Sequence, residues 1–305
     1  MRRCVIIMNP ESGKVKKLDS KKEFYDILRK YDYEAEIKYT KRAKDATRIV
    51  EELDDDIDLV ISAGGDGTLN EVVSGNMLRE KKLVIANLPM GTTNDVANMY
   101  GYTKKLEKNL EILLKGVVKN IDVCYIDDSV FVYVCCLGDY IDMAYNTPRE
   151  QKKKYGKLAY AMYALKRIGK KINNYDIKYK VDGKEYSGNY SFIFITNATR
   201  VAGVDDIYYD VKLDDNMFEV ALASPKSKPE LFKMAAQVLN KDIKDIPGVT
   251  YYQTNNFEIE FLSKLKKSWC IDGEEYKTRK KKYTFKLDKI MQMLMPKENV
   301  EKLFK

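Results

Sequence analysis

One aspartate, Asp66, lies among three glycines in the stretch "DLVISAGGDGTLNEVVSG", between an apolar run and a run with helical character. Glycines there permit positive φ angles and let backbone N–H groups converge on an anion at the start of a helix. Thr68 and Glu71 are expected to form a capping box for that helix. Asp66 would repel a bound phosphate unless a cation lay between them, so the stretch predicts a site for Mg²⁺ and phosphate. The other interpretation is an ordinary strand-to-helix turn, in which Gly and Asp are common.

Two further turns have the same plan. The segment "KLVIANLPMGTTNDVANMYG" again combines a strand, a glycine turn and a helix, whose entrance carries Thr92, Thr93, Asn94 and Asp95. A third turn, "NPESGK" from Asn9 to Lys14, follows the first strand. Because ligands bind at the carboxyl ends of the strands in α/β sheets, we expect the three turns to hold one nucleotide together.

The chain contains no histidine. This absence excludes Ser-His-Asp and Cys-His nucleophile systems, H-E-x-x-H zinc sites and histidine general bases. Any catalysis must therefore depend on carboxylates, lysines, backbone dipoles and a hard cation such as Mg²⁺. The cysteines show no C-x-x-C spacing, which favours free thiols in a reducing cytosol. They are Cys4, Cys124, Cys135, Cys136 and Cys270.

Composition indicates a soluble globular protein, with 45% hydrophobic and 33% charged residues in a length of 305. The longest apolar run, "VFVYVCCLG", is far shorter than the ~18 residues needed to cross a bilayer. The N-terminus is interpreted as a buried strand and not as a signal peptide. The formal charge of +8 has two interpretations, a codon bias toward Lys, Asn and Tyr or a preference for an anionic partner.

The order of the elements predicts two domains. Strand and helix patterns alternate over the first third of the chain, which indicates a parallel sheet covered by helices. From about Ile121 the pattern changes to short strands separated by turn dipeptides, as in a mainly antiparallel β-sandwich. We therefore expect an α/β nucleotide-binding domain over 1–121, on which the C-terminal tail 290–305 packs back, and a β-sandwich domain over 122–289.

Two helices interrupt the predicted β region. The first, "GKLAYAMYALKRIGKKI" from Gly156 to Ile172, is expected to pack in the core, with a basic cluster gathered toward its C-terminus. The second, "KPELFKMAAQVLN", has Pro229 at a first-turn position and is expected to be purely structural.

Six motifs occur in a fixed order over nearly the whole chain: "NPESG", "GGDGTLNEVVSG", "LPMGTTNDVAN", "NIDVCYI", "KLDDNMFEV" and "WCIDGEEY". In this the chain resembles the diacylglycerol kinase catalytic domain family, which includes bacterial lipid kinases, sphingosine kinases and ceramide kinases. "GGDGT" alone is moderately specific, because NAD kinases and phosphofructokinases carry similar loops. "GTTNDVA", some 25 residues later, is much more specific to the lipid kinases.

The resemblance implies a kinase that uses ATP and Mg²⁺ to phosphorylate the hydroxyl of diacylglycerol or a related neutral lipid, bound by the second domain. It implies that Glu274 is the general base for the lipid hydroxyl. It also implies that Asp66, Asp95 and Asp122 organise the catalytic Mg²⁺, partly through water. The residues implied to hold ATP are Asn9, Pro10, Glu11, Ser12, Gly13, Thr40, Gly65, Asp66, Gly67, Thr68, Leu69, Asn70, Glu71 and Thr92.

A structural metal site is implied as well, formed by Asp215 and the backbone carbonyls of Lys212 and Met217. Two departures from the family pattern affect this loop. Asn216 replaces the usual glycine, and because Asn tolerates left-handed backbone best among non-glycine residues, we expect the loop to be retained. Tyr209 replaces the proline that is usual just upstream.

Other functions remain as alternatives. An NAD kinase shares the phosphate loop and the two-domain plan, although "GTTNDVA" stands where those enzymes carry a different pattern. A catalytically silent lipid or nucleotide sensor is disfavoured because the acidic residues are retained. Nucleic-acid binding is not expected, because the basic runs belong to no recognisable binding module.

Basic groups suggest how the chain reaches a lipid substrate. Lys152–Lys154, Lys166–Lys171 and Arg279–Lys282 would attract an anionic membrane, each residue contributing ~1 kcal/mol near the surface. We therefore expect a cytoplasmic protein with peripheral, salt-sensitive membrane contact. The sequence leaves open whether it is a monomer or a homodimer.

Overall fold

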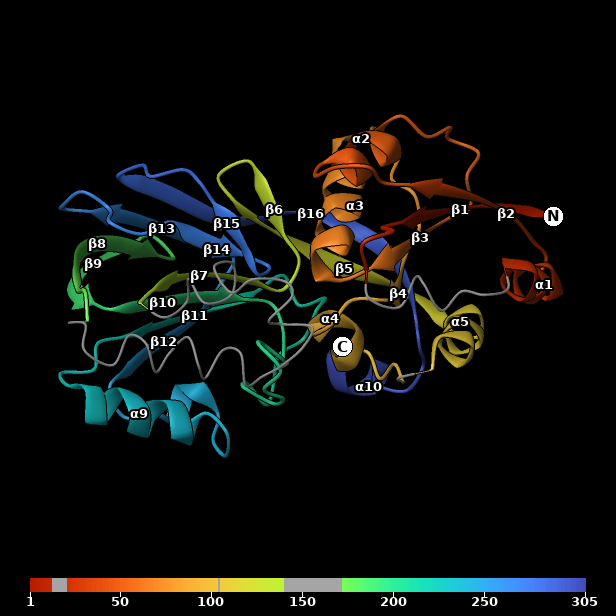
Figure 1. Ribbon diagram of the computed structural model, residues 1–305. Coiled ribbons are helices and arrows are strands. Elements are labelled where there is room, and N and C mark those ends of the chain that lie inside the picture. Colours follow the sequence, from red (N-terminus) through yellow and green to blue (C-terminus); the bar gives the residue numbers. More distant parts are fainter. Residues whose placement is uncertain (13–20, 104, 140–171) are drawn as a thin grey trace. The chain divides into compact units, whose positions relative to one another are not determined.

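The computed structural model describes residues 1–12, 21–103, 105–139 and 172–305 (Figure 1). The predicted helix from Gly156 to Ile172 lies almost wholly outside these residues, as do the basic groups Lys152–Lys154 and Lys166–Lys171. The chain forms two compact units. Unit 1 contains Met1–Val123 and Lys289–Lys305, and unit 2 contains Cys124–Asp288.

Unit 1 is built on a parallel sheet with the strand order β2-β1-β3-β4-β16. Every residue of β3 and β4 is buried, which explains why their sequences are nearly continuous apolar runs without alternation. The strands predicted for the first third of the chain are confirmed. Their bounds are β1 (Arg2–Met8), β2 (Tyr33–Tyr39), β3 (Leu59–Gly64) and β4 (Ile85–Pro89). The fifth strand of the order, β16 (Lys282–Met295), comes from the C-terminal part of the chain.

Helices cover both faces of this sheet. Helix α2 packs against α3, and α1 packs against α5. Figure 1 shows the two pairs on opposite sides of the strands of unit 1, as in a doubly wound fold. The helices are α1 (Lys21–Lys30), α2 (Asp45–Glu51), α3 (Asp66–Leu78), α4 (Asp95–Met99), α5 (Leu106–Leu114) and α10 (Val300–Leu303).

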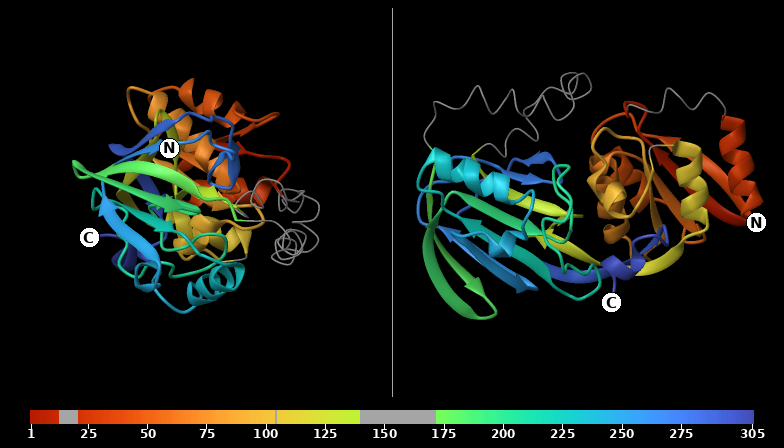
Figure 2. Two further views of the ribbon diagram at one scale, coloured as in Figure 1. Left: turned by 90° about the vertical axis from the view of Figure 1, so that its left-hand side faces the viewer. Right: turned by 90° about the horizontal axis from the view of Figure 1, so that it is seen from below.

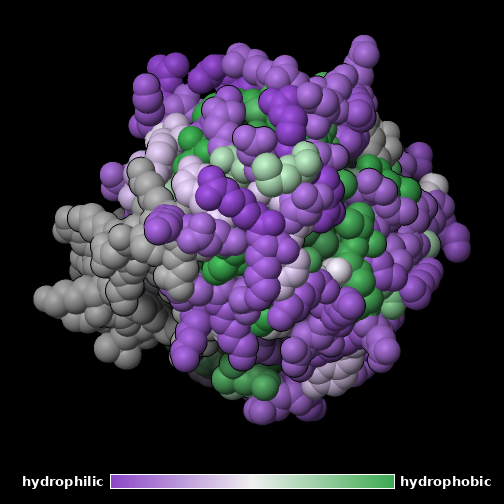
Figure 3. Space-filling model, turned by 90° about the vertical axis from the view of Figure 1, so that its right-hand side faces the viewer, coloured by the Kyte–Doolittle hydropathy of each residue, from purple (hydrophilic) through white to green (hydrophobic). Residues whose placement is uncertain are grey.

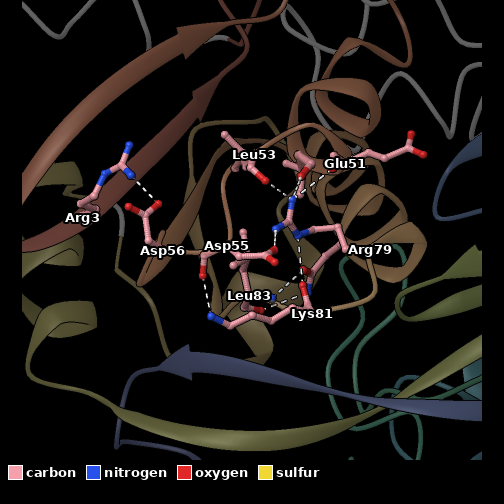
Figure 4. Close-up of polar contacts among 10 residues, drawn as sticks. Arg3, Glu51, Leu53, Asp55, Asp56, Arg79, Lys81 and Leu83 are labelled. Carbon is pink, nitrogen blue, oxygen red and sulfur yellow. Dashed lines mark hydrogen bonds and ion pairs between the residues drawn. The ribbon is translucent and has the colours of Figure 1, made fainter.

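A buried arginine joins the ends of α2 and α3. The side chain of Arg79 is 4% exposed, and it follows directly after the last residue of α3. Its guanidinium donates hydrogen bonds to the carbonyls of Val50, Glu51 and Leu53 and forms an ion pair with Asp55 (Figure 4). These carbonyls lie at and just beyond the end of α2, where helical N–H donors run out; the carbonyl of Val50 also accepts from the amide of Leu53 at 3.3 Å.

The surface shown in Figure 3, on the side of β1, β2 and α1, is predominantly hydrophilic, and its hydrophobic residues occur in small groups. Among the residues that the structure describes, no helix is long and hydrophobic enough to pass through a bilayer.

Unit 2 consists of two antiparallel sheets. One has the order β16-β13-β8-β9, with β5 and β6 paired beside it, and the other has the order β12-β11-β10-β7-β14-β15. Both β5 and β16 contribute residues to each unit. The further elements are β5 (Val117–Ile126), β6 (Ser129–Phe131), β7 (Val134–Gly138), β8 (Tyr175–Val181), β9 (Lys184–Tyr190), β10 (Phe192–Thr196), β11 (Phe218–Ala223), α9 (Lys228–Gln237), η2 (Ile243–Asp245), β12 (Val249–Thr254), β13 (Asn256–Phe261), β14 (Trp269–Ile271) and β15 (Glu274–Tyr276).

The core of unit 2 lies between its two sheets. Phe257 and Phe285 from one sheet and Phe218 and Trp269 from the other belong to a single buried cluster. The rings of Trp269 and Phe285 meet edge-on, with centroids 5.2 Å apart. The predicted fold class, a parallel-sheet α/β part followed by a mainly antiparallel sandwich, is therefore confirmed.

One predicted strand is divided in the structure. The apolar run "VFVYVCCLG" has the pattern of one short strand, but it forms β6 and β7 with a break at Val132 and Tyr133. The backbone N–H groups of both residues donate to the carboxylate of Asp272, at 2.7 and 3.1 Å. They are therefore not free to continue a strand ladder, and nothing in the apolar run itself indicates this.

All five cysteines are buried free thiols, which confirms that part of the prediction. Cys136 of β7 and Cys270 of β14 are cross-strand neighbours. Burial raises the pKa of the Cys4 thiol to about 12, so this group stays protonated at neutral pH.

Candidate functional site

The predicted nucleotide-binding turns follow strands that end at the same level. Met8 of β1 is aligned with Tyr39 of β2 and Ala63 of β3, and Gly64 of β3 is aligned with Pro89 of β4. The turns after these strands therefore meet at one edge of the sheet of unit 1. The residues brought to this edge are Asn9, Pro10, Glu11, Ser12, Thr40, Gly65, Asp66, Gly67, Thr68 and Thr92. Gly13 lies outside the described residues.

The glycine turns after β3 and β4 are in backbone contact. A Cβ atom added to Gly91 would lie 2.6 Å from the Cα of Gly65, and one added to Gly64 would lie 2.3 Å from Oγ1 of Thr68. The amide of Gly91 also donates to the carbonyl of Gly64 at 3.1 Å. A side chain at Gly91 would prevent this approach, so the glycine lets main-chain groups of the two turns meet at the sheet edge.

Gly65 and Gly91 differ in how much space this contact leaves for a side chain. A Cβ added to Gly65 would lie 3.4 Å from Gly91, which is ordinary contact, whereas the converse distance is 2.6 Å. We therefore expect Gly91→Ala to lower the free energy of unfolding by about 1 to 3 kcal/mol, as overpacking does. The matched variant Gly65→Ala should change it by much less. Urea denaturation of both variants tests this, and equal losses would contradict the assigned contact.

The predicted capping box is wrong. Helix α3 begins at Asp66, two residues before Thr68, and its N-cap is Gly65, which has no side chain to cap with. The carboxylate of Glu71 instead accepts hydrogen bonds from the amides of Lys44 (2.8 Å) and Ala46 (3.2 Å) at the start of α2. Since the glycine run lets the chain turn early, Glu71 falls on the side of α3 that packs against α2. The contacts of Leu69, Asn70 and Glu71 with ATP stay predictions.

Asp66 connects the two glycine turns. Its carboxylate accepts hydrogen bonds from the amides of Asp95 (3.0 Å) and Val96 (3.3 Å), which form the first turn of α4. A carboxylate at this place satisfies helix donors that have no partner within the helix and is favoured by the helix dipole. Asp66 therefore fixes the orientation of α4 as well as contributing negative charge to the sheet edge.

Asn94 stabilises the turn after β4; the sequence placed it at the entrance of the helix but assigned it no role of its own. Its backbone is left-handed, with φ 50° and ψ 54°. Its side-chain Oδ1 accepts from the amide of Gly91 at 2.9 Å, and its Nδ2 donates to the carbonyl of Gly91 at 2.8 Å. The signal in the sequence was an Asn directly before a helix and three residues after a turn glycine, since Asn tolerates left-handed backbone.

The turn after β1 is hydrogen-bonded to the turn after β3. The side-chain Oδ1 of Asn9 accepts from the amide of Glu11 at 3.0 Å, and its Nδ2 donates to Oγ1 of Thr68 at 3.4 Å. The amide of Asn9 donates to the carbonyl of Ala63 in β3. Thr40, which follows β2, is buried, and its amide donates to the carbonyl of Met8. These hydrogen bonds connect the turns that follow β1, β2 and β3.

The predicted acidic triad belongs to three elements of unit 1. Asp66 opens α3 and is half-buried, whereas Asp95 in α4 and Asp122 in β5 are buried. Within the residues that the structure describes, no three acidic or cysteine side chains are close enough to hold a metal ion directly. Mg²⁺ commonly binds one or two carboxylates, with waters and substrate phosphates as its other ligands. The oxygen donors present therefore fit Mg²⁺ held partly through water, and the roles of the triad stay predictions.

Glu274 belongs to unit 2 and lies on a tight hairpin. It is exposed at the first position of β15, and the turn before it contains Asp272 (φ 48°) and Gly273 (φ 89°). Asp272 is buried, and its carboxylate accepts three backbone amides, including that of Val134 at 3.1 Å. Asp272 thus anchors the hairpin that carries Glu274, whereas the sequence indicated only a turn at the Asp-Gly dipeptide.

The loop of the predicted structural metal also lies in unit 2. Asn216 is left-handed (φ 60°), as expected from its replacement of glycine. Asp215 accepts from the amide of Met217 at 3.0 Å and from Nε2 of Gln253 at 3.3 Å, and the same Nε2 lies 3.4 Å from Oε1 of Glu219. Burial, and secondarily Asp215, raises the pKa of Glu219 to about 8. Two neighbouring carboxylates suit a hard cation, and the metal itself stays a prediction.

Comparisons with known proteins agree with one another. The model of the diacylglycerol kinase catalytic domain matches residues 3–126. A diacylglycerol kinase of Bacillus subtilis (strain 168) is 28% identical over 308 residues, covering 99% of each chain. A diacylglycerol kinase of Staphylococcus aureus (strain bovine RF122 / ET3-1) is 27% identical over 277 residues, covering 90% of this chain and 86% of the other.

Solved structures show the same fold. The crystal structure of a diacylglycerol kinase from Bacillus anthracis str. Sterne superposes with a TM-score of 0.78 at 22% identity, covering 98% of this chain and 99% of the other. The three comparisons agree: residues 3–126 match the diacylglycerol kinase catalytic domain, the whole chain is similar in sequence to bacterial diacylglycerol kinases, and it has the fold of one.

Proposed function

We propose that the protein is a cytoplasmic lipid kinase that transfers the γ-phosphate of ATP, with Mg²⁺, to the hydroxyl of diacylglycerol or a related neutral lipid. The product is phosphatidic acid or its analogue. The observation that carries the proposal is the meeting of the turns after β3 and β4, where Gly65 and Gly91 are in backbone contact and Asp66 caps α4. Similarity to the diacylglycerol kinases of Bacillus subtilis and Staphylococcus aureus supports a lipid acceptor.

ATP would bind at the sheet edge of unit 1. Gly65 and Gly67 are half-buried there, and Thr92 is exposed beside them and presents a hydroxyl. Amides and hydroxyls that converge at the start of helices are suitable donors to phosphate oxygens. Asp66 and Asn94 act as positioning residues. Asp66 accepts from the amide of Asp95 and so joins the turn after β3 to α4, whereas Asn94 bonds to Gly91 and shapes the turn after β4.

The transfer step needs a base and neutralised phosphate charge, and no histidine. Glu274 takes the proton of the lipid hydroxyl while the hydroxyl oxygen forms a bond to the γ-phosphorus and the bond to the β–γ bridging oxygen breaks, releasing ADP. When bound, Mg²⁺ neutralises charge on the phosphates. Asp66, Asp95 and Asp122 are the residues proposed to hold it, in part through water.

The reaction can be tested with γ-labelled ATP and a panel of neutral lipids in mixed micelles, with and without Mg²⁺. We expect label in diacylglycerol or a close analogue only when Mg²⁺ is present. Asp66→Asn should reduce this label strongly, whereas the matched variant Asp54→Asn, on an exposed loop of unit 1, should not. Label in NAD and in no lipid would overturn the proposal and favour the NAD kinase alternative.

The one predicted basic group that the structure describes, Arg279–Lys282, has part of its charge paired with carboxylates of the same unit. Of the three groups, Arg279–Lys282 is described, and two of its lysines already form ion pairs. Lys280 pairs with Asp127 at 2.9 Å, and Lys282 pairs with Glu260 at 3.2 Å. This group therefore has part of its charge balanced locally, and another surface of unit 2 is a better candidate for membrane contact.

A further inference from the structure

Helix α9 exposes a continuous apolar stripe. It contacts the rest of unit 2 through Met234, the residue of the helix that is buried. On its other side Phe232 is 54% exposed, and Leu239, in the turn that continues the helix, is 64% exposed. Ala235 and Ala236 lie between them and are exposed as well. A helix expected to be purely structural thus has an uncovered apolar face.

The spacing places these residues in one row. Positions i, i+3, i+4 and i+7 fall within an arc of roughly 100° on a helix of 3.6 residues per turn, and Met234 lies opposite that arc. Figure 1 shows α9 below β11 and β12, and the view from below in Figure 2 shows it in front of the strands of unit 2. The stripe therefore faces away from the sheets.

The ends and edge of the stripe are basic. Residues 226–241 contain four lysines and a single glutamate. Lys226, Lys233 and Lys241 are exposed. Glu230 is half-buried, and its carboxylate accepts a hydrogen bond from the amide of Lys226 at 2.7 Å. An apolar row with lysines around it is complementary to an anionic lipid surface, which offers acyl chains beneath negatively charged headgroups.

A tyrosine extends this surface beyond the helix. The amide of Tyr209 donates to the carboxylate of Asp242 at 2.9 Å, which places Tyr209 beside the segment that follows Leu239. The amide of Ile243 donates to the carbonyl of Ile207, so the two segments run together. The Tyr209 side chain is 51% exposed. Tyrosine is favoured where an apolar region meets water, as at a membrane interface.

We propose that α9 docks on an anionic membrane, with Phe232 and Leu239 inserted at the boundary between headgroups and acyl chains and with its lysines against the headgroups. The inference rests on the proposed function, since a kinase acting on membrane lipid must reach that surface. It identifies a surface outside the three basic groups considered from the sequence, and it assigns a role to the tyrosine that departs from the family pattern.

Co-sedimentation with vesicles tests the surface. Wild-type protein should bind vesicles of phosphatidylglycerol and phosphatidylcholine and bind those of phosphatidylcholine alone much less. Phe232→Ser/Leu239→Ser should weaken binding about 10-fold or more, because each side chain loses the gain from apolar burial. Lys226→Gln/Lys233→Gln/Lys241→Gln should weaken it at low salt and much less at high salt. Leu262→Ser, at a leucine of unit 2 that is 52% exposed, is the matched control and should bind normally.

Fluorescence gives a second readout. The chain has one tryptophan, Trp269, which is fully buried and supplies a constant background. Phe232→Trp should show a blue shift when anionic vesicles are added, whereas Leu262→Trp should show none. Equal behaviour of the two variants would overturn the proposal, and so would vesicle binding that the stripe substitutions leave unchanged.

Two controls separate this proposal from others. If wild type is dimeric in sedimentation velocity and Phe232→Ser/Leu239→Ser is monomeric, the stripe is a contact between copies of the chain and the membrane proposal is wrong. Phosphorylation of a short-chain diacylglycerol in micelles should be equal in wild type and the stripe variant. Absence of lipid phosphorylation by wild type, together with stripe-dependent vesicle binding, would refute the proposed function and leave the membrane surface in place.

Discussion

Glu274→Gln is expected to lower kcat for lipid phosphorylation by about 10² to 10⁴-fold, which corresponds to ~3 to 5 kcal/mol in the barrier. Glutamine keeps the size and hydrogen-bonding reach of the side chain but cannot accept the proton of the lipid hydroxyl. The exposed position on an anchored hairpin tolerates this change, so folding should be unaffected. The measurement is steady-state transfer of labelled phosphate to diacylglycerol in mixed micelles.

The neighbouring glutamate provides the control. Glu275 is also exposed on β15, and alternation along a strand directs it to the opposite face. Glu275→Gln should therefore keep nearly full activity, and the KM for ATP should be similar in both variants. Comparable losses in the two variants, or full activity in Glu274→Gln, would remove Glu274 from the mechanism.

Arg79→Met is expected to destabilise unit 1 by roughly 3 to 5 kcal/mol. The carbonyls of Glu51 and Leu53 lose their side-chain donor and that of Val50 keeps only the amide of Leu53, and each buried unsatisfied group costs about 1 to 3 kcal/mol. Methionine fills the same space but supplies no N–H groups. Because α3 begins in the glycine turn after β3 and packs against α2, we expect the loss of stability to lower activity at raised temperature as well. Urea denaturation followed by circular dichroism measures the effect.

Arg3 is the matched control for Arg79. Its guanidinium pairs with Asp56 and Asp54, but all three side chains are largely exposed (Figure 4 shows the pair with Asp56 beside the Arg79 cluster). Exposed ion pairs contribute little to stability. Arg3→Met should therefore shift the urea midpoint far less than Arg79→Met, and equal shifts would show that burial of the Arg79 guanidinium is not what stabilises the helix ends.

Much of the fold could be predicted because the hydrophobicity pattern of a segment agrees with the burial of that segment in the structure. The continuous apolar runs of β3 and β4 indicated strands buried on both faces, and the Asp-Gly dipeptide at Asp272 indicated a hairpin, which the structure contains. The alternation of strands and helices then required a parallel sheet, whose strand ends share an edge. The turns at that edge could be found from their glycines.

Other features depend on contacts between segments far apart in sequence. The partner of Glu71 is α2, and the partners of Asp272 lie about 140 residues earlier, so local motifs could not reveal either role. The capping-box prediction was wrong for this reason. A Glu three residues after a Thr can also accept hydrogen bonds from a neighbouring helix, as Glu71 does from the start of α2. Likewise, the stripe on α9 has the spacing of a core-packing face, and only its exposure shows that it is not covered.

The central claim is that ATP is held at the sheet edge where the turns after β1, β3 and β4 meet. Hydrogen–deuterium exchange with and without Mg²⁺–ATP tests it most directly. We predict protection in peptides covering Asn9–Ser12, Gly65–Thr68 and Gly91–Val96, with no change in the β8–β9 hairpin. Protection should be lost in Asp66→Asn while that variant remains folded. Protection at other segments, or none at these turns under saturating Mg²⁺–ATP, would contradict the account.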